Sequence, residues 1–356
     1  MKERYLILED GNVFKGEAFG ADKEALGELV FTTGMVGYLE TLSDPSYYGQ
    51  IVVQTFPIIG NYGVIEEDFE GELRLNGYVV REWCPTPSNF RSMYDIDTLL
   101  KKRGIPGISG LDTRRLTKMI RERGVMNAKI SDTIPTDISD VKNYNIIEAV
   151  RSVTCKETEA HLPAQKKYRV VLIDYGAKRN IVRELIKRGC EVIVVPSTVT
   201  AEEVLAYAPD GIMLSNGPGN PAHNMGCVEE IKKLFGKTPI FGICMGHQLL
   251  ALANGGRSLK LKYGHRGANQ PVKETSGERT YITSQNHGYA VDAENLENGV
   301  MTYANANDGT CEGIDYPGHY AFSVQFHPEA CSGPKDTEFL FEKFIGLIEQ
   351  FKADKK

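Results

Sequence analysis

The stretch Pro239–Asn254, PIFGICMGHQLLALAN, decides the fold of the C-terminal half of the chain. Its first five residues are apolar and predict a strand buried on both faces, and the residues after Cys244 predict a helix. Gly242 and Gly246 flank this cysteine. A strand that turns so abruptly into a helix needs glycines at these places, because a Cβ would clash, and the turn raises the thiol above the edge of the sheet.

The segments before this stretch repeat the same alternation. Near-continuous apolar runs predict strands at Arg169–Asp174, Cys190–Val195 and Gly211–Ser215, and a helical pattern over Lys178–Lys187 separates the first two. Apolar strands that alternate with helices are typical of a parallel sheet covered on both faces. The sequence therefore predicts an α/β fold over residues 167–356, with a mostly parallel open sheet and helices on both of its faces.

Residues 1–155 follow another pattern, which predicts a strand-rich mixed α/β domain. Asp10-Gly11-Asn12 separates two short apolar runs and predicts a hairpin turn. Helices are predicted at Asp95–Lys102 and Asp112–Arg123, because each opens with an acidic cap and ends in basic residues before a glycine. A charged stretch with one proline, residues 156–166, predicts a linker between the two domains.

The composition disfavours several classes of protein. The 356 residues carry a formal net charge of −6, whereas a nucleic-acid-binding protein normally has a basic excess. Apolar runs fall short of the roughly 20 residues of a membrane span, and Leu6-Ile7-Leu8 is too short for a signal-peptide core. Seven cysteines without a CxxC pair are typical of free thiols in a reducing compartment. We therefore expect a cytoplasmic protein that binds neither nucleic acid nor membrane.

The position of Cys244 favours nucleophilic chemistry. The dipole of a helix stabilises a thiolate at its N-terminus, and the thiolate is the reactive form of cysteine. The backbone N–H of Met245 would point to the place where an oxyanion forms during attack on a carbonyl. A structural cysteine is the alternative, because the motif is short and free cysteines are commonly buried.

A second motif supplies a base for this nucleophile. Ala321–Phe326 predicts a strand that ends at His327, and Pro328 stops it. In a parallel sheet this histidine and Cys244 would both lie at the carboxyl ends of strands, where catalytic groups gather. Glu329 could fold back and fix the tautomer of the imidazole. The alternative is a surface histidine beside a glutamate in a solvated loop.

A glycine-rich loop, Ser215–Pro221, follows the third strand. Glycines let backbone approach a ligand and direct N–H groups to it, although an ordinary tight turn has the same composition. The sequence has no GxxxxGK[ST] motif and no GxGxxG that opens a helix after a strand, so we expect no ATP or dinucleotide on this chain. Zinc bound by Cys244 with His247, or by Cys331 with His327, is disfavoured because no second ligand pair is evident.

Together these motifs resemble the class I glutamine amidotransferases, which use a Cys-His-Glu triad. The matching residues run in the family's order: Asn216-Gly217-Pro218-Gly219, Gly242–Gln248, Ser284–Tyr289 and His327-Pro328-Glu329. The N-terminal half resembles the small subunit of carbamoyl phosphate synthetase in the segments Phe31–Tyr38, Asp44–Tyr47, Gly60–Gly63 and Gly110–Arg114. The resemblance covers nearly the whole chain, and it implies the flavodoxin-like amidotransferase fold for residues 167–356.

The resemblance implies a role for each matching residue. Cys244 would be the nucleophile, His327 the general acid and base, and Glu329 the group that orients His327. Met245 and Gly217 would form the oxyanion hole. Contacts to L-glutamine are implied at Ser46, Gly217, Gly219, Met245, Gln248, Asn286, Gly288 and Tyr289. Met245 and Tyr289 stand where Leu and Phe are usual, but both would contact the substrate through backbone atoms.

The resemblance also implies a partner, in a heterodimer or a larger complex. Ammonia would pass to a large subunit that makes carbamoyl phosphate from bicarbonate and ATP for pyrimidine and arginine synthesis. ATP and Mg²⁺ would bind on that subunit, with no cofactor and no metal on this chain. Residues 1–155 would dock the large subunit and cover one side of the glutamine site. The alternatives are another triad amidotransferase, a non-catalytic regulatory subunit and a cysteine peptidase on the same fold.

Overall fold

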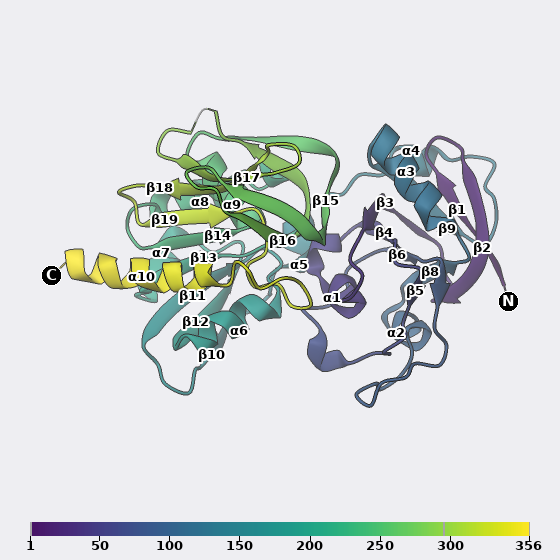
Figure 1. The fold of residues 1–356 in the computed structure, drawn as a ribbon, viewed down its shortest axis with the longest axis horizontal. Helices are drawn as coiled ribbons and strands as arrows, with labels where there is room; N and C mark the ends of the chain where they lie inside the picture. Colours follow the sequence, from purple (N-terminus) through teal and green to yellow (C-terminus); the bar gives the residue numbers. More distant parts are fainter. Residues whose placement is uncertain (1, 295, 356) are drawn as a thin grey trace. The chain divides into compact units, whose positions relative to one another are not determined.

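The computed structural model describes residues 2–294 and 296–355. The chain divides into two compact units, Met1–Ile147 and Glu148–Lys356, each with its own sheet (Figure 1). The predicted linker, 156–166, differs from the structure: it contains β10 (Glu159–His161), which pairs antiparallel with β12 (Cys190–Pro196) in the second unit. Because β10 is a short and mostly exposed edge strand, its polar sequence has no alternating apolar pattern.

The sheet of the first unit closes into a barrel, a finer arrangement than the strand-rich domain that the sequence predicts. The strands follow the order β1-β2-β8-β6-β4-β3-β9, and β9 pairs back with β1. The barrel strands are β1 (Glu3–Leu8), β2 (Val13–Gly20), β3 (Ala25–Thr32), β4 (Gln50–Gln54), β6 (Gly77–Val79), β8 (Pro106–Ser109) and β9 (Met126–Ser131). Smaller elements are α1 (Tyr38–Ser43), β5 (Ile58–Ile59), β7 (Glu82–Trp83), α4 (Ser139–Lys142) and the 3₁₀ turns Pro45–Tyr47 and Glu66–Asp68.

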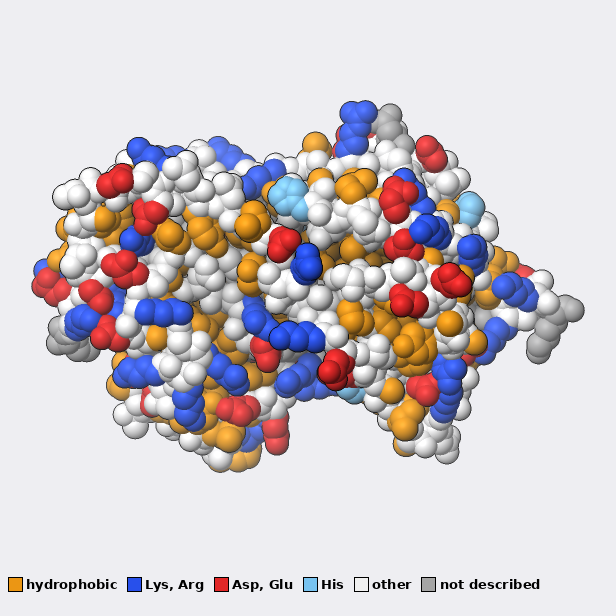
Figure 2. Space-filling model, turned by 180° about the vertical axis from the view of Figure 1, so that it is seen from behind, with side chains coloured by type: hydrophobic (Ala, Val, Ile, Leu, Met, Phe, Trp, Pro, Cys, Tyr) orange, Lys and Arg blue, Asp and Glu red, His pale blue; other side chains and the backbone are white. Residues whose placement is uncertain are grey.

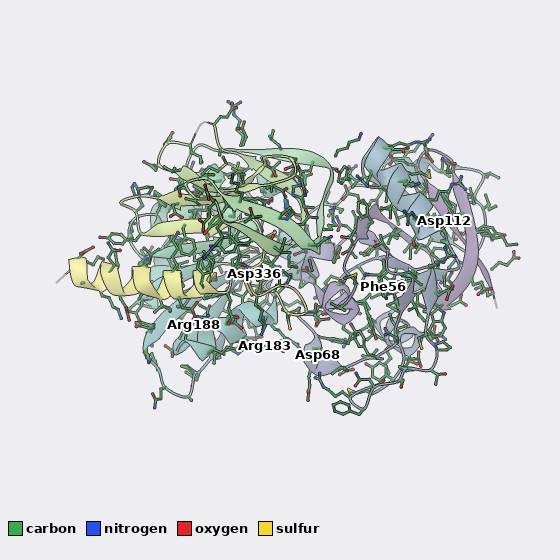
Figure 3. The ribbon with its side chains drawn as sticks, viewed as in Figure 1. Phe56, Asp68, Asp112, Arg183, Arg188 and Asp336 are labelled. Carbon is green, nitrogen blue, oxygen red and sulfur yellow. The ribbon has the colours of Figure 1, made fainter. Side chains whose placement is uncertain are left out.

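The predicted hairpin turn and the two predicted helix caps form in the first unit. Asp10-Gly11-Asn12 forms the turn of the β1–β2 hairpin, with Gly11 at a φ of 87°. The side chains of Asp95 and Asp112 cap α2 (Ile96–Arg103) and α3 (Thr113–Arg123), each by accepting a first-turn N–H; Figure 3 labels Asp112. Both predicted helices and the predicted hairpin are therefore confirmed.

The sheet of the second unit has a parallel part. Its strand order begins β10-β12-β11-β13-β14-β19, and the last five strands in this order run parallel to one another. Besides β12, the parallel strands are β11 (Tyr168–Asp174), β13 (Gly211–Leu214), β14 (Ile240–Ile243) and β19 (Ala321–Val324). These are the strands that the apolar runs predict, although β19 ends two residues before its predicted end.

The rest of this sheet is antiparallel, which corrects the prediction of a mostly parallel sheet. Beyond β19 the order continues β18-β16-β15-β17. These strands are β18 (Cys311–Tyr316), β16 (Thr280–Asp292), β15 (Arg257–Glu274) and β17 (Val300–Asn305). Their charged and glycine-containing sequences lack the buried apolar run that identifies the parallel strands. The mixed α/β class is confirmed, but the sheet itself is mixed.

Alternate strand residues enter two different cores, one on each face of the parallel strands. Val171 and Ile212 pack with α7 (Ala201–Ala206), α8 (Met225–Leu234) and α9 (Met245–Ala253). On the other face, residues such as Leu172 and Phe241 pack with α6 (Arg179–Lys187) and α10 (Phe339–Asp354). The helix α5 (Ala149–Val153) adds Val150 to the first core. Helices thus cover both faces, and the carboxyl ends of the parallel strands carry the candidate site.

Surface properties agree with the composition. On the face drawn in Figure 2, acidic and basic side chains are interspersed rather than gathered into a stripe of one sign. Among the helices of residues 2–294 and 296–355, none has the length and apolar character needed to cross a bilayer.

Candidate active site

Cys244 lies in a strained turn between β14 and α9. Its φ of 52° and ψ of −101° are unfavourable for a residue with a side chain. An added Cβ at Gly246 would come within 2.2 Å of the carbonyl oxygen of Leu214, and one at Gly242 within 2.8 Å of Gly246. The predicted steric need for both glycines is confirmed.

Backbone hydrogen bonds hold this turn against its neighbours. The N–H of Cys244 donates to the carbonyl of Val324 at the end of β19, over 2.9 Å. The N–H of Gly246 donates to the carbonyl of Ser215, also over 2.9 Å, which ties the glycine-rich loop to the start of α9. Met245 opens that helix, where the first N–H groups have no acceptor within the helix. The thiol is only 2% exposed and therefore lies in a site shielded from bulk water.

His327 and Glu329 form a buried pair beside the end of β19. Nδ1 of His327 lies 2.6 Å from Oε1 of Glu329, and both side chains are fully buried. The N–H of His327 donates to the carbonyl of Ser284 over 2.9 Å, so β16 fixes its backbone. Because a carboxylate can only accept, Nδ1 carries a proton, and Nε2 is left for exchange with a reacting group.

The charge around His327 favours its protonated form. Burial and the ammonium of Lys178 lower its pKa, but Glu329 and the interaction with Cys244 outweigh them and raise the pKa to about 9. Glu329 has its pKa lowered: burial acts in the opposite direction, and the charge of His327 prevails. Nε2 of His327 has no well-aligned hydrogen-bond partner among the described residues. The imidazole thus interacts with the thiol without being fixed to it.

Lys178 is a member of this site that the sequence analysis missed. Its Nζ lies 3.4 Å from Nδ1 of His327 and 3.8 Å from Oε1 of Glu329. The side chain is 12% exposed. A signal was available, because Lys178 follows the carboxyl end of β11, the same sheet edge as Cys244. The lysine stabilises the Glu329 carboxylate and limits how far the pKa of His327 rises.

Hydrogen bonds and close contacts link three of the residues predicted to contact glutamine to the turn at Cys244 and to one another. The Cys244 sulfur is 3.8 Å from the carbonyl oxygen of Asn286. Nε2 of Gln248 donates to the carbonyl of Tyr289 and to Oε1 of Gln325, each over 2.9 Å. The structure therefore connects α9 to the 286–289 segment of β16, which also contains Gly288. Gln325 is a further buried link that the sequence analysis did not single out.

The remaining predicted contacts are in two loops. Gly217 and Gly219 lie in the loop that Ser215 anchors, and Gly217 is so close to Tyr175 that a Cβ would approach its carbonyl oxygen to 2.3 Å. Ser46 lies in the first unit, where its N–H donates to the Asp44 carboxylate over 2.9 Å. Its contact to glutamine stays a prediction.

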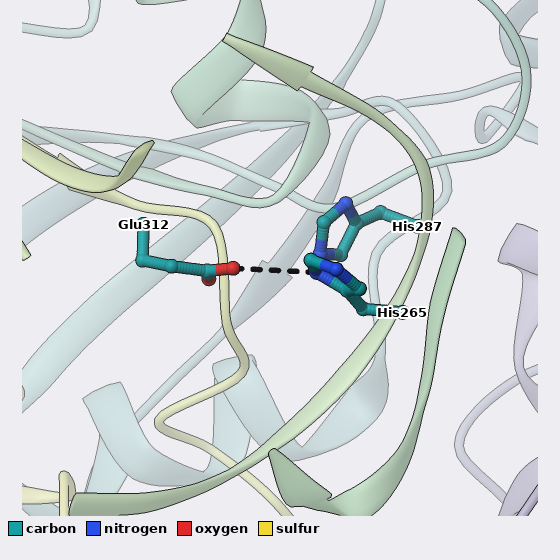
Figure 4. Close-up of side chains that lie close together, drawn as sticks. All are labelled: His265, His287 and Glu312. Carbon is teal, nitrogen blue, oxygen red and sulfur yellow. Dashed lines mark ion pairs between the residues drawn. The ribbon is translucent and has the colours of Figure 1, made fainter. Parts of the chain in front are cut away.

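One group in the described part of the chain has the spacing of metal ligands: His265, His287 and Glu312 (Figure 4). Its atoms already have protein partners, which include Asp308 and Asn305. His247, which the sequence analysis considered as a zinc ligand with Cys244, contacts a serine of β19. Its Nδ1 lies 2.8 Å from the Ser323 hydroxyl.

Comparison with known proteins gives the same division of the chain. Residues 171–347 match the family of class I glutamine amidotransferases, and residues 6–130 match the CPSase domain of the carbamoyl-phosphate synthase small chain. A carbamoyl phosphate synthase small chain of Bacillus thuringiensis subsp. konkukian is 49% identical and covers 99% of this chain and 98% of its own.

Two further relatives agree over similar lengths. The small chain of Fusobacterium nucleatum is 51% identical and covers 98% of this chain and 99% of its own. The pyrimidine-specific small chain of Halalkalibacterium halodurans is 50% identical and covers 98% of both. On these full-length identities, and with a class I amidotransferase domain in its second unit, the chain belongs to the carbamoyl phosphate synthase small chain family.

Proposed function

We propose that this chain hydrolyses L-glutamine through Cys244, His327 and Glu329 and delivers the ammonia to a carbamoyl phosphate synthase large subunit. The observation that carries the proposal is the strained cysteine at a helix N-terminus, next to a buried His327–Glu329 pair. Membership of the small chain family supports glutamine as the substrate. A non-catalytic subunit would have no need to maintain this strain.

The first half-reaction forms a thioester. The thiolate of Cys244 bonds to the side-chain carbonyl carbon of glutamine, and the N–H groups of Met245 and Gly217 stabilise the negative charge on its oxygen. The C–N bond then breaks, and the nitrogen leaves as ammonia after it takes a proton from Nε2 of His327. A raised pKa suits His327 to this step, because the imidazole holds that proton at neutral pH.

The second half-reaction restores the enzyme. His327, now neutral, takes a proton from water while the water oxygen bonds to the thioester carbon. The C–S bond breaks, glutamate leaves, and its new carboxyl group loses a proton to solvent. Cys244 returns as a thiolate beside protonated His327. Glu329 keeps the imidazole in one orientation through both steps.

Substitution of the nucleophile tests the proposal. Cys244→Ala should abolish glutamine-dependent carbamoyl phosphate synthesis by the complex and leave ammonia-dependent synthesis intact, because only the glutaminase step needs the thiol. The matched control is Cys190→Ala: this thiol is also buried, and burial raises its pKa to about 12. Normal glutaminase turnover by Cys244→Ala would refute the whole assignment.

The first unit serves in this proposal to dock the large subunit, on which ATP and Mg²⁺ bind, and to supply Ser46 to the glutamine site. The proline after Asp44 restricts this loop, and the Asp44 carboxylate holds the Ser46 N–H. A fragment of residues 148–356 keeps α5 and β10 with the sheet to which they belong. It should fold but bind glutamine weakly and fail to join the large subunit. Capture of the large subunit by this fragment at full-length affinity would exclude that division of labour.

A further inference from the structure

Strand β16 connects the candidate active site to a second buried histidine cluster. At its residue Ser284 it accepts the N–H of His327, and at Asn286 and Tyr289 it supplies carbonyls next to Cys244 and Gln248. Strand β16 also pairs with β15, and there His265 of β15 lies opposite His287 of β16. Register shifts occur in β15 on both sides of this short paired segment. Such irregularities disrupt the backbone ladder locally, on both sides of the segment.

Glu312 of β18 is the centre of this cluster and is 0% exposed. Its Oε2 accepts from Nε2 of Gln285 over 3.0 Å, and its Oε1 accepts from Nδ2 of Asn305 over 3.3 Å. Nδ1 of His265 lies 3.4 Å from Oε1, the contact drawn in Figure 4. Nε2 of His265 lies 2.8 Å from a carboxylate oxygen of Asp308. His265 is thus placed between two carboxylates.

This placement favours a proton on both nitrogens of His265. Burial lowers its pKa, but Glu312 and Asp308 outweigh burial and raise it. The pKa of Glu312 is raised as well, because burial outweighs the opposing effect of His265; the contacts of His265 with two carboxylates are what favour the charged form of the pair. His287 also faces His265, with its ring centroid 4.9 Å away. Burial, and then His265 and Arg266, hold the pKa of His287 well below its usual range, so His265 is the member of this pair that carries the positive charge.

The charge on Glu312 determines how Gln285 is oriented. An ionised carboxylate only accepts, so it turns the Gln285 amide nitrogen toward itself, and the amide oxygen then faces Nε2 of His287 at 3.1 Å. Nδ1 of neutral His287 donates its single proton to the carbonyl oxygen of Tyr289 over 2.7 Å, an oxygen that Gln248 also contacts. Nε2 then meets the Gln285 oxygen as a packing contact without donating to it. A chain of side chains therefore runs from Glu312 to the glutamine-contact segment.

We infer that Glu312 and His265 are positioning residues, an ion pair that holds the 285–289 segment of β16 in the geometry that binds glutamine. The inference rests on the proposed function and deepens it. The pairing of β16 with β18 in the described residues is the single pair Val291↔Cys311. The Gln285–Glu312 contact therefore adds a side-chain link between the active-site end of β16 and β18.

The same three side chains have the spacing of a metal site, but their donors favour the ion pair. Nδ2 of Asn305 lies 3.5 Å from Nδ1 of His265 and 3.3 Å from Oε1 of Glu312. Its oxygen accepts the N–H of Asn307 over 2.9 Å, which fixes the amide orientation. An amide N–H group is therefore directed at Oε1 of Glu312, an oxygen that a bound cation would need as a ligand.

Steady-state kinetics of Glu312→Gln is the first test. The variant keeps the size of the side chain and removes its charge, so we expect the glutamine KM of the complex to rise about tenfold or more while kcat changes less than about threefold. The matched control is Glu184→Gln, a buried glutamate of α6 paired with Lys187 and Arg188. It should leave KM unchanged. An unchanged KM in Glu312→Gln overturns the inference but leaves the proposed function standing, since Cys244→Ala tests that separately.

Nitrogen NMR of histidine-labelled protein is the second test, and it does not depend on turnover. The His265 ring, assigned from the signals lost in His265→Asn, should titrate above the usual pH range of histidine in the wild type and at lower pH in Glu312→Gln. Asp308→Asn should act in the same direction and is safer for folding, because the Asp308 side chain is 42% exposed. A His265 ring that titrates at the same pH in the wild type and in Glu312→Gln, or one stoichiometric zinc that Glu312→Gln removes, would overturn the ion pair.

Discussion

Two buried histidine–carboxylate pairs in the second unit, His327–Glu329 and His265–Glu312, are alike in composition and differ in what surrounds them. Both imidazoles have a raised pKa, and both belong to one sheet, His265 within β15 and His327 just beyond the end of β19. Nε2 of His327 has no aligned partner among the described residues, whereas both nitrogens of His265 face carboxylates. A histidine with an open bonding position can exchange a proton, and one with both positions occupied can only hold its neighbours.

The neighbouring backbone differs in the same way. Beside His327 is Cys244, whose φ of 52° stores strain at the buried nucleophile. Beside His265 are β-strand residues paired across a ladder. Strain combined with an unfilled hydrogen-bond position is therefore a better marker of the reactive centre than a histidine–carboxylate pair or a raised pKa alone.

Parallel asparagine substitutions give the largest expected contrast. His327→Asn should reduce kcat for glutamine hydrolysis by about 10²–10⁴-fold, because it removes the acid and base. Glu329→Ala should be milder, since it removes only the group that orients the base. His265→Asn should raise KM and leave kcat nearly unchanged. Steady-state rates that fall equally in His265→Asn and His327→Asn would erase the distinction between the two pairs.

Glycine substitutions test whether the strained turn is needed. Gly246→Ala should lower the free energy of unfolding by on the order of 3 kcal/mol and remove glutaminase activity, because its Cβ would meet a backbone carbonyl that cannot move aside. Gly226→Ala in α8 is the control, as its Cβ would meet nothing within 4 Å and alanine favours a helix. Thermal unfolding of both variants should separate them; equal melting temperatures would mean that the turn adapts.

The turn at Cys244 could be predicted from sequence because its causes are local. Strand, glycine, nucleophile and helix follow one another within a few residues, and steric exclusion leaves little choice. The caps at Asp95 and Asp112 are local in the same sense. For these features the physical reason and the sequence signal are in the same place.

Other features depend on contacts between distant parts of the chain, and sequence alone did not give them. Closure of the barrel needs β9 to pair with β1, more than a hundred residues earlier. The sequence of β15 is charged and contains glycine, so no apolar run indicates a strand. Glu312 looks like an ordinary strand glutamate until the structure places it against Gln285 and His265. Lys178 could have been found, because the carboxyl ends of parallel strands share an edge.

The smallest effect concerns the pH dependence of stability. The pKa of His327 is raised from 6.5 to about 9 in the folded chain, so its stabilising contribution is complete below pH 6.5 and is lost as the pH rises through 9. The difference in unfolding free energy between wild type and His327→Asn should therefore shrink by on the order of 2 kcal/mol between pH 6.5 and 9.

Glu329, with a lowered pKa, contributes in the opposite direction, and its contribution is lost only at acidic pH. In a Glu329→Ala background the His327 contribution should disappear at lower pH, because the carboxylate that raises the pKa is gone. Denaturant titrations across this pH range measure both effects. If the difference in unfolding free energy between wild type and His327→Asn did not change with pH, the folded chain would not raise the pKa of His327.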